Sequence, residues 1–236
     1  MLGSVLYEAM AEPGILYVVA TPIGNLKDIT LRALETLRDA DRVVAEDTRV
    51  TKKLLERNKI STPLFPLHAR STESQFEKVV AMVEGGQTIA LVTDAGTPGI
   101  SDPGERIVSM VRERCGEKAI VPIPGASAVT AALSVSGYPS DEFVFLGFLP
   151  HKKGRQKLLD EVALMKRTVV LYESPHRMAK LLGELALRMP DRHILIAREL
   201  TKMFEEIAEG SVTDVRRRFE NGDISGKGEF VVIIAP

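Results

Sequence analysis

A loop rich in glycine and proline carries two aspartates directly after an apolar run, at residues 93–104. Open α/β sheets bind their ligands at the carboxyl ends of strands, which is where this loop is predicted to lie. Asp102, followed by proline and by Glu105, has the pattern of a helix N-cap with a capping-box glutamate. No such local role is visible for Asp94, and the nearby glycine permits close approach of a ligand. We therefore predict that Asp94 binds a ligand and that Asp102 is structural.

Polar residues follow other predicted strands in the same way. They occupy residues 21–25, 46–49, 124–128, 173–177 and 198–202. Random surface loops would not place polar residues so regularly after apolar strands. We therefore predict that these loops line one shared cleft.

Two of these loops have a structural interpretation as well, and both interpretations stay open. Asp47 can cap a helix that begins at the next residue, with Glu46 and Arg49 paired at the surface. Ser127 can cap its helix, or it can lie where backbone amides bind a ligand carboxylate.

The loop that begins at Glu173 is more informative about proton transfer. Ser174 and Pro175 fit an N-cap and a first helical position, so we take both as structural. Glu173, just before this cap, is then the more interesting residue. His176 would lie in the first helical turn, where the helix dipole favours neutral imidazole. There it can accept a proton or simply form a hydrogen bond.

Two groups of basic residues remain. The group Lys152, Lys153, Arg155 and Lys157 fits either a solvated face or a phosphate contact. The arginines at 216–218 are expected on a helix surface.

The elements that must position these loops alternate between strand and helix in the first half of the chain. Short apolar runs at 15–20, 42–45, 63–67, 88–92 and 119–123 predict buried strands. Helical patterns lie between them, most clearly at Phe76, Val79, Val80 and Val83. This rhythm predicts a doubly wound α/β domain with a parallel sheet.

The rhythm changes near residue 138. Strands are predicted at 143–148, 168–172, 193–197 and 230–235, with helices after the first two. The fold class is therefore α/β with two α/β domains. We predict an N-terminal extension at 1–14, a first domain at 15–138 and a second domain at 139–236.

Composition excludes several classes. The formal net charge is −1, so bulk attraction to nucleic acid is not built into the chain. One cysteine excludes an internal disulfide, and with four scattered histidines it gives no zinc spacing, so no metal is expected. No apolar stretch is long enough to span a membrane, and the first residues lack the basic region of a signal peptide. We expect a soluble, cytoplasmic protein. The dinucleotide fingerprint, the P-loop and the hydrolase nucleophile elbow are absent from the sequence.

Six motifs, taken together, resemble one family. They are Val-Ala-Thr-Pro-Ile-Gly-Asn-Leu at 19–26, Glu-Asp-Thr-Arg at 46–49, the loop at 93–104, Pro-Gly-Ala-Ser-Ala at 124–128, Glu-Ser-Pro-His-Arg at 173–177 and Arg-Glu-Leu-Thr-Lys at 198–202. They look like those of the bacterial small-subunit ribosomal RNA 2′-O-methyltransferase I, a branch of the tetrapyrrole methylase superfamily. The resemblance runs in order from residue 15 to residue 236. Members that act on tetrapyrroles tend to carry Gly-Pro-Gly-Asp after the first strand, so Thr-Pro-Ile-Gly-Asn here favours the RNA branch.

The resemblance implies a two-domain enzyme with a doubly wound, mostly parallel first sheet and a mixed second sheet. It implies S-adenosylmethionine in the cleft between the domains and a homodimer. The implied reaction is methylation of a cytidine ribose in small-subunit (16S) RNA, as naked RNA or in the 30S subunit. Many ribosomal members continue past the last strand with a small helical region.

Site residues carry over by motif. The implied cofactor-binding residues are Pro22, Asp94, Gly96, Thr97, Ser127, Ala128, Tyr172, Leu200 and Glu229. A ribose hydroxyl is a poor nucleophile, and the candidates for its proton acceptor are Glu173 and Glu199, then His176, then Glu46. Guanidinium groups match phosphate oxygens. The candidate RNA contacts are Arg49, Arg177, Arg198 and Lys202.

Two predictions test these assignments, and two other functions stay open. Asp94→Ala should abolish cofactor binding. Glu173→Gln should lower turnover and leave cofactor binding unchanged. One alternative is C-methylation of a tetrapyrrole such as a corrin precursor. The other is a non-catalytic RNA-binding protein, which the near-neutral charge disfavours.

Overall fold

The computed structural model describes residues 12–236, so most of the extension predicted at 1–14 lies outside the described residues. The contacts divide the chain into two compact units. The first unit holds the described residues up to Thr21 and Asp28–Gly125, and the second holds Pro22–Lys27 and Ala126–Pro236.

The first unit is built on a five-stranded sheet. Its strands are β1 (Leu16–Val19), β2 (Arg42–Ala45), β3 (Leu64–Pro66), β4 (Ile89–Val92) and β5 (Ile120–Ile123). They follow the order β3-β2-β4-β1-β5, and every neighbouring pair is parallel. The predicted doubly wound parallel sheet is confirmed.

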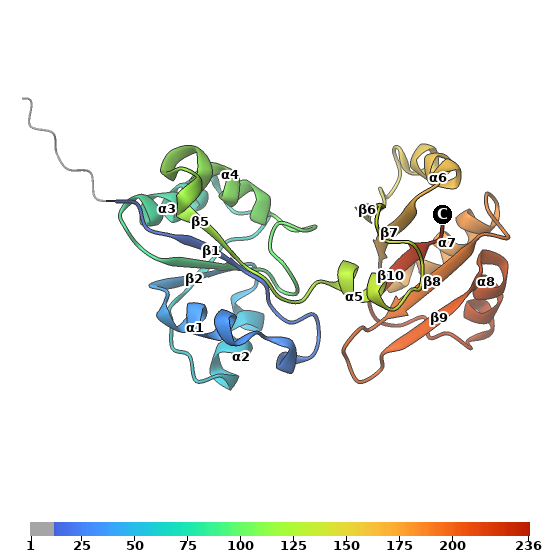
Figure 1. Ribbon diagram of the computed structural model, residues 1–236, viewed down its shortest axis with the longest axis horizontal. Coiled ribbons are helices and arrows are strands. Elements are labelled where there is room, and N and C mark those ends of the chain that lie inside the picture. Colours follow the sequence, from blue (N-terminus) through green and yellow to red (C-terminus); the bar gives the residue numbers. More distant parts are fainter. Residues whose placement is uncertain (1–11) are drawn as a thin grey trace, which may run out of the picture. The chain divides into compact units, whose positions relative to one another are not determined.

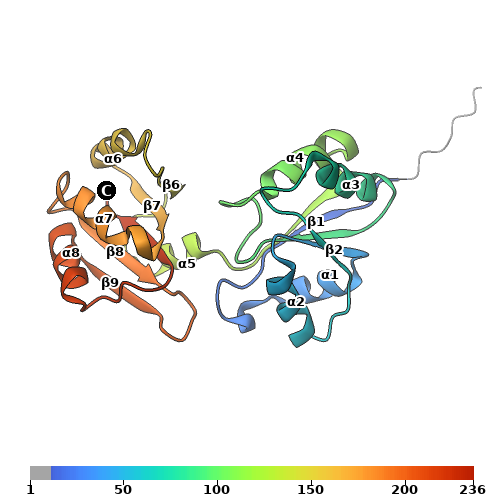
Figure 2. The same ribbon diagram turned by 180° about the vertical axis from the view of Figure 1, so that it is seen from behind.

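Helices cover both faces of this sheet (Figures 1 and 2). They are α1 (Leu31–Asp39), α2 (Thr48–Arg57), α3 (Glu73–Glu84) and α4 (Gly104–Cys115), with short 3-10 turns at Leu26–Asp28 and Glu117–Ala119. Phe76 and Val79 of α3 pack with Ile107 of α4 against Leu16 and Leu91 of the sheet. Burying side chains of this size stabilises the unit by about 1.5–3 kcal/mol each.

The second unit has a mixed sheet, as predicted. Its strands are β6 (Phe143–Phe148), β7 (Thr168–Glu173), β8 (His193–Arg198), β9 (Glu206–Ser211) and β10 (Phe230–Ile234). In the order β6-β7-β10-β8-β9, the β6–β7 pair is parallel and the other pairs are antiparallel. The edge strand β9 was missed because its sequence, Glu-Ile-Ala-Glu-Gly-Ser, has few apolar residues.

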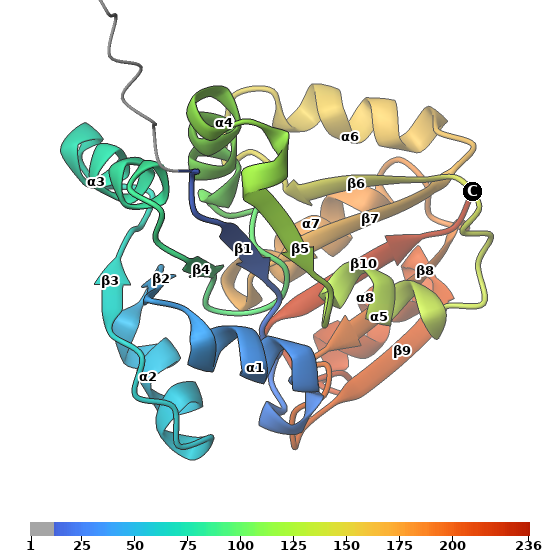
Figure 3. The same cartoon turned by 60° about the vertical axis from the view of Figure 1, so that its left-hand side comes forward.

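Alternate residues of these strands face two different sets of helices. Val169, Leu171 and Val232 pack against α6 (Arg155–Leu164), α7 (Pro175–Ala186) and α8 (Val212–Asn221). Val170 and Val231 pack on the opposite face against α5 (Ala128–Ser134), seen in Figure 3. The division into units therefore falls before α5, earlier than the predicted boundary after residue 138. The run of small residues after Ser127 predicts a helix at α5 but not the sheet on which it packs.

No helix among residues 12–236 is long and apolar enough to cross a membrane.

Candidate functional site

Three strand ends of the first unit are tied together by hydrogen bonds around the loop after β4. The Thr21 and Gly96 backbones bond to each other in both directions, at 2.9 and 3.1 Å, which joins this loop to the end of β1. The Asp94 carboxylate accepts a hydrogen bond from the Asp47 N–H at 2.9 Å, which joins it to the end of β2. The Thr93 hydroxyl donates to Glu46 at 2.9 Å. The predicted gathering of polar loops is present within this unit.

Asp94 thus has a local partner, which the sequence did not reveal. Its side chain is exposed, and only Oδ1 is hydrogen-bonded within the described residues. Gly96 and Gly99 have φ angles of 86° and 87°, which favour glycine. The loop therefore presents one oriented carboxylate oxygen beside tightly turned backbone, an arrangement that suits the polar part of a small ligand.

Asp102 has the structural role that was predicted, with a different geometry. Its Oδ1 accepts hydrogen bonds from the Gly99 and Gly104 N–H groups, both at 2.8 Å. Helix α4 begins at Gly104 with Pro103 as its N-cap, so the predicted capping box with Glu105 is not formed. The carboxylate pins the loop to the start of α4.

Asp47 caps α2, and Arg49 pairs with it. The Asp47 side chain accepts from the Arg49 N–H at 2.8 Å and from the Arg49 guanidinium. These hydrogen bonds with Arg49, of the side chain first, lower the pKa of Asp47 to about 2. The Arg49 side chain is 87% exposed, so it stays accessible to a phosphate.

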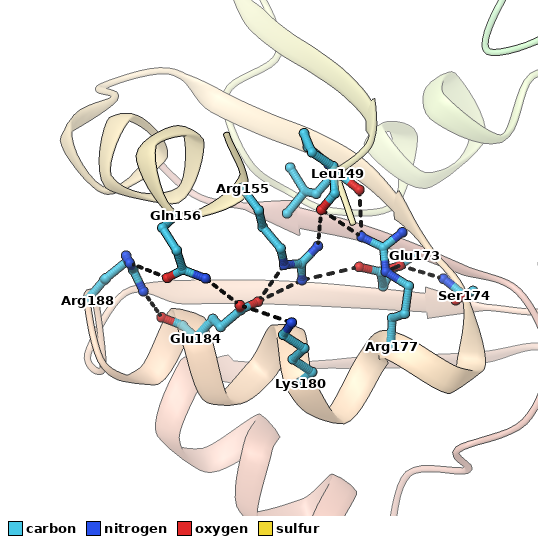
Figure 4. A network of polar contacts seen from close by, with 10 residues as sticks. Leu149, Arg155, Gln156, Glu173, Ser174, Arg177, Lys180, Glu184 and Arg188 are labelled. Atoms are coloured by element: carbon cyan, nitrogen blue, oxygen red, sulfur yellow. Dashed lines mark hydrogen bonds and ion pairs between the residues drawn. The ribbon is translucent and has the colours of Figure 1, made fainter. Parts of the chain in front are cut away.

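The Glu173 side chain of the second unit points into the interior between α6 and α7 (Figure 4). It is fully buried, and its Oε1 accepts from the Ser174 N–H at 2.9 Å. Arg177 Nε lies 3.3 Å from Oε1, and Arg155 Nη2 lies 3.6 Å from Oε2. A general base must reach the substrate hydroxyl. The structure therefore does not support Glu173 as the base, and gives it the role of a buried ion-pair partner.

Arg155 and Glu184 complete this network, and neither was singled out from the sequence as part of a core. Arg155, the first residue of α6, is only 1% exposed and donates to Glu184 at 2.8 Å. Burial acts to raise the pKa of Glu184, but hydrogen bonds from Arg155 and Gln156 outweigh it and hold the pKa below its usual value. In the sequence, Arg155 lies among basic residues that are exposed, and nothing in that pattern indicated that its side chain is buried.

Two of the four predicted RNA contacts are used inside the second unit. Arg198 donates to Glu206, to the Lys227 carbonyl and to the Phe204 carbonyl, at 2.8, 3.0 and 2.8 Å. All its guanidinium nitrogens are therefore occupied, and it is 9% exposed. Arg177 donates to the Leu149 carbonyl at 2.5 Å and pairs with Glu173, as described above. The structure does not support Arg198 or Arg177 as phosphate ligands.

A strained turn follows β8. Glu199 and Thr201 have φ angles of 50° and 65° without being glycine, a conformation that costs about 1–3 kcal/mol each and often marks functional sites. The Asn25 N–H donates to the Thr201 hydroxyl at 3.0 Å. A Cβ added at Gly24 would lie 2.5 Å from the Lys202 side chain. The predicted loops at 21–25 and 198–202 therefore meet inside this unit.

Glu199, Lys202 and Glu229 form a charged triad at this turn. Lys202 Nζ lies 2.8 Å from Glu199 Oε1 and 2.8 Å from Glu229 Oε2. Burial acts to raise the pKa of Glu199, but the hydrogen bonds from Lys202 and the Glu229 N–H outweigh it, so the pKa is lowered. Burial acts to lower the pKa of Lys202, and its two carboxylate partners raise it overall. Glu199 is therefore a poor proton acceptor, and the charge of Lys202 is already compensated.

The other predicted cofactor contacts of the second unit form an apolar wall. Tyr172, Leu200 and Ala128 pack against the α5 face of the sheet. The Tyr172 ring lies 5.0 Å from the Phe145 ring and 5.5 Å from the Phe148 ring, centroid to centroid. Ser127 is the N-cap of α5 but makes no side-chain capping bond, and Pro22 is buried.

His176 is exposed in the first turn of α7. Of the other three candidate bases, Glu173 is buried, Glu199 is paired with Lys202, and Glu46 is half-buried and accepts a hydrogen bond from Thr93. No group of three or more potential metal ligands occurs in residues 12–236.

Comparison with known proteins agrees with this architecture. The family model described as Tetrapyrrole (Corrin/Porphyrin) Methylases matches residues 15–216. A protein of Halalkalibacterium halodurans named ribosomal RNA small subunit methyltransferase I is 45% identical, with 97% of this chain and 78% of the relative covered. A protein of the same name from Synechocystis is 47% identical, with 94% and 79% covered.

A solved structure with the same fold is uroporphyrin-III C-methyltransferase from Thermus thermophilus, complexed with S-adenosyl homocysteine. Its TM-score is 0.64 at 18% identity, with 94% of this chain and 97% of that chain covered. At this identity the likeness shows the fold alone. Because the family model covers most of the chain and the relatives match nearly all of it, the chain belongs to the tetrapyrrole methylase family and, within it, to the ribosomal RNA small subunit methyltransferase I group.

Proposed function

We propose that this protein transfers a methyl group from S-adenosylmethionine to the 2′-hydroxyl of a cytidine in small-subunit ribosomal RNA. One observation carries the proposal: proteins named for methylation of that RNA are 45–47% identical over nearly the whole chain. The polar strand-end loops and the apolar aromatic wall described above provide the side chains that such an enzyme needs.

The residues present fit the cofactor in chemical type. In the first unit, Asp94 keeps one carboxylate oxygen without a protein hydrogen bond, which suits an ammonium or ribose hydroxyl group. The turned backbone at Gly96 and Gly99 lies in the same loop, and Thr97 lies between these two glycines. In the second unit, Tyr172, Leu200 and Ala128 provide an apolar surface. Glu229 has an 80% exposed side chain and supplies a carboxylate in the second unit.

When bound, S-adenosylmethionine supplies an electrophilic methyl group, and its transfer forms a carbon–oxygen bond, breaks the carbon–sulfur bond and releases the hydroxyl proton. His176 is our candidate to accept this proton, because it is exposed and makes no ion pair. Glu199 and Lys202 act instead through their mutual ion pair, which holds the strained turn in place.

RNA contact is assigned to exposed cations. Arg49 is still our proposed phosphate ligand, because its side chain is 87% exposed. Lys202 is held by two carboxylates and would have to exchange them for phosphate. We further propose that the enzyme is a homodimer, that it acts in the cytoplasm and that the 30S subunit is a substrate.

Methylation of a tetrapyrrole is the alternative within the family. The related structure named for such an activity is only 18% identical and shares the fold alone. The sequence after β1 also lacks the Gly-Pro-Gly-Asp turn typical of those enzymes.

The decisive experiment measures transfer of a labelled methyl group to three acceptors: 30S subunits, naked small-subunit RNA and a corrin precursor. We expect the label to enter a cytidine of the RNA. The RNA should then resist alkaline cleavage at that nucleotide, because a 2′-O-methyl group removes the nucleophile of RNA hydrolysis. Turnover on the corrin precursor alone would replace the proposal by its alternative. Binding of RNA without any transfer would favour a non-catalytic role.

A further inference from the structure

The loop between β6 and α6 presents positive charge that the proposed mechanism does not use. It consists of Pro150, His151, Lys152, Lys153 and Gly154, all exposed, and is called the basic loop below. Among residues 12–236, no carboxylate lies within ion-pair distance of Lys152 or Lys153, whereas the next lysine, Lys157, pairs with Glu161. The two lysines therefore carry uncompensated charge.

Two enclosed guanidiniums hydrogen-bond the backbone at the start of this loop, and one of them belongs to the residue that follows the loop. Arg177 donates to the carbonyl of Leu149, just before the loop, at 2.5 Å. Arg155, just after it, donates to the Pro150 carbonyl at 3.4 Å. Figure 4 shows both guanidiniums reaching toward this backbone from α7 and α6. Gly154 closes the loop with a φ angle of 84°, which favours glycine.

Two glutamates neutralise the charges of the two arginines that bond the start of the loop. Glu173 lies between them, and Glu184 lies 2.7 Å from Arg155. Burying such groups is costly unless they are paired and hydrogen-bonded. The network therefore fixes the backbone of the basic loop without adding charge to the surface, and leaves Lys152 and Lys153 as the exposed cations.

An exposed aromatic ring lies next to the loop in the chain. Phe148, two residues before Pro150, is 54% exposed, and its ring contacts the Tyr172 ring at an angle of 60° between the planes. Proteins that bind single-stranded RNA combine cations that contact the backbone with aromatic rings on which bases stack. This pairing distinguishes an RNA surface from a site for a small anion.

We propose that the basic loop binds the phosphate backbone of the substrate RNA through Lys152 and Lys153, with Phe148 as a stacking platform. The inference rests on the proposed function for the identity of that RNA. Arg155, Glu173 and Arg177 are positioning residues, because they act through the loop backbone and do not touch RNA.

The test is binding of unmethylated small-subunit RNA by the full chain across a range of salt concentrations. Each phosphate contact contributes about 0.7–0.9 to the slope of log affinity against log salt, so the double variant Lys152→Ala/Lys153→Ala should lose about 1.4–1.8. At 0.1 M salt this corresponds to roughly 30-fold weaker binding. The matched control is Lys118→Ala/Lys166→Ala, which removes two exposed lysines elsewhere. It should leave the RNA affinity and the salt slope unchanged.

Failure of this inference and failure of the proposed function give different results. Wild-type protein that methylates RNA, together with a double variant that binds RNA with unchanged affinity and slope, would overturn the role of the loop. Wild-type protein that transfers no methyl group to RNA, but whose binding depends on the two lysines, would refute only the proposed function. Loss of binding to phosphatidylglycerol vesicles with unchanged RNA affinity would assign the loop to a lipid surface and overturn the inference.

A second pair of variants tests the positioning role. Arg177→Met removes the anchor at Leu149, and Arg188→Met removes an equally enclosed arginine of the same region that bonds Asp160 and Gln156 instead. The first should raise KM for RNA several-fold with kcat unchanged, whereas the second should change neither constant. Equal effects of both variants on KM would show that the network is merely structural.

Discussion

Replacing Glu173 by glutamine distinguishes a buried ion-pair partner from a catalytic base. The substitution keeps the shape of the side chain and its bond from the Ser174 N–H, but removes the charge between Arg155 and Arg177. Arg155 would keep Glu184 as its partner. Arg177 would keep only the Leu149 and Pro150 carbonyls, which carry no charge.

The expected cost follows from burial. Removing one partner of a buried ion pair destabilises a protein by about 3–5 kcal/mol, because the remaining charge is left without compensation. The Glu173 side chain is fully buried, so solvent does not reduce this value. For a domain of this size the loss corresponds to a fall of roughly 10–20 °C in Tm.

The assay combines unfolding in urea with turnover at saturating RNA, below the unfolding transition of the variant. We expect lower stability and a kcat close to that of the wild type. The control is Glu161→Gln, which removes an exposed carboxylate of α6 and should change the free energy of unfolding by less than about 1 kcal/mol. Unchanged stability with kcat reduced by about 10²–10⁴-fold, the range for loss of a general base, would refute our assignment.

Three further variants test other parts of the site. Asp94→Asn keeps an acceptor for the Asp47 N–H but removes the charge, so affinity for S-adenosylmethionine by calorimetry should fall about 10–100-fold; Asp102→Asn should leave it unchanged. The pKa of Asp47 is lowered from 3.8 to about 2 in the folded protein, so its ionised form stabilises the fold above pH 3.8, and this contribution is lost as the pH falls through 2. In urea unfolding, Asp47→Asn should therefore lose stability relative to the wild type at pH 5 but not at pH 2. Arg198→Met should lower the unfolding free energy by about 3 kcal/mol without changing the salt dependence of RNA binding; a smaller slope would restore Arg198 as a phosphate ligand.

The sequence predicts the strands well because burial on both faces leaves a visible pattern. The apolar runs at β1, β2, β4 and β5 correspond to strands within a residue or so. Helix ends are marked less clearly. Asp28 is a residue type that caps helices, yet it lies in a 3-10 turn, and the N-cap of α1 is Thr30, which accepts from the Ala33 N–H. Such errors shift an element end but not the fold.

The direction of polar side chains at strand ends could not be predicted. Asp94, Glu173 and Arg198 all follow apolar strands, yet Asp94 is exposed while the other two point into the second unit. Whether such a residue faces solvent depends on partners distant in sequence, such as Arg155 for Glu173. In the same way, Arg155 follows two exposed lysines in the sequence, but its own side chain is buried and bonds the backbone of the loop that carries them.

The exposure of the candidate side chains decides which of them can accept the proton of the substrate hydroxyl. Glu173 is enclosed, Glu199 is paired with Lys202, and Glu46 is half-buried and hydrogen-bonded by Thr93, so His176 at the surface of α7 is the exposed proton acceptor among the four candidates. General-base assistance is worth about 3–5 kcal/mol, whereas alignment of donor and hydroxyl can supply about 7–11 kcal/mol. We therefore expect His176→Gln to lower kcat by no more than about 10²-fold, with the affinity for cofactor unchanged. A kcat of His176→Gln equal to that of the wild type would mean that another group accepts the proton.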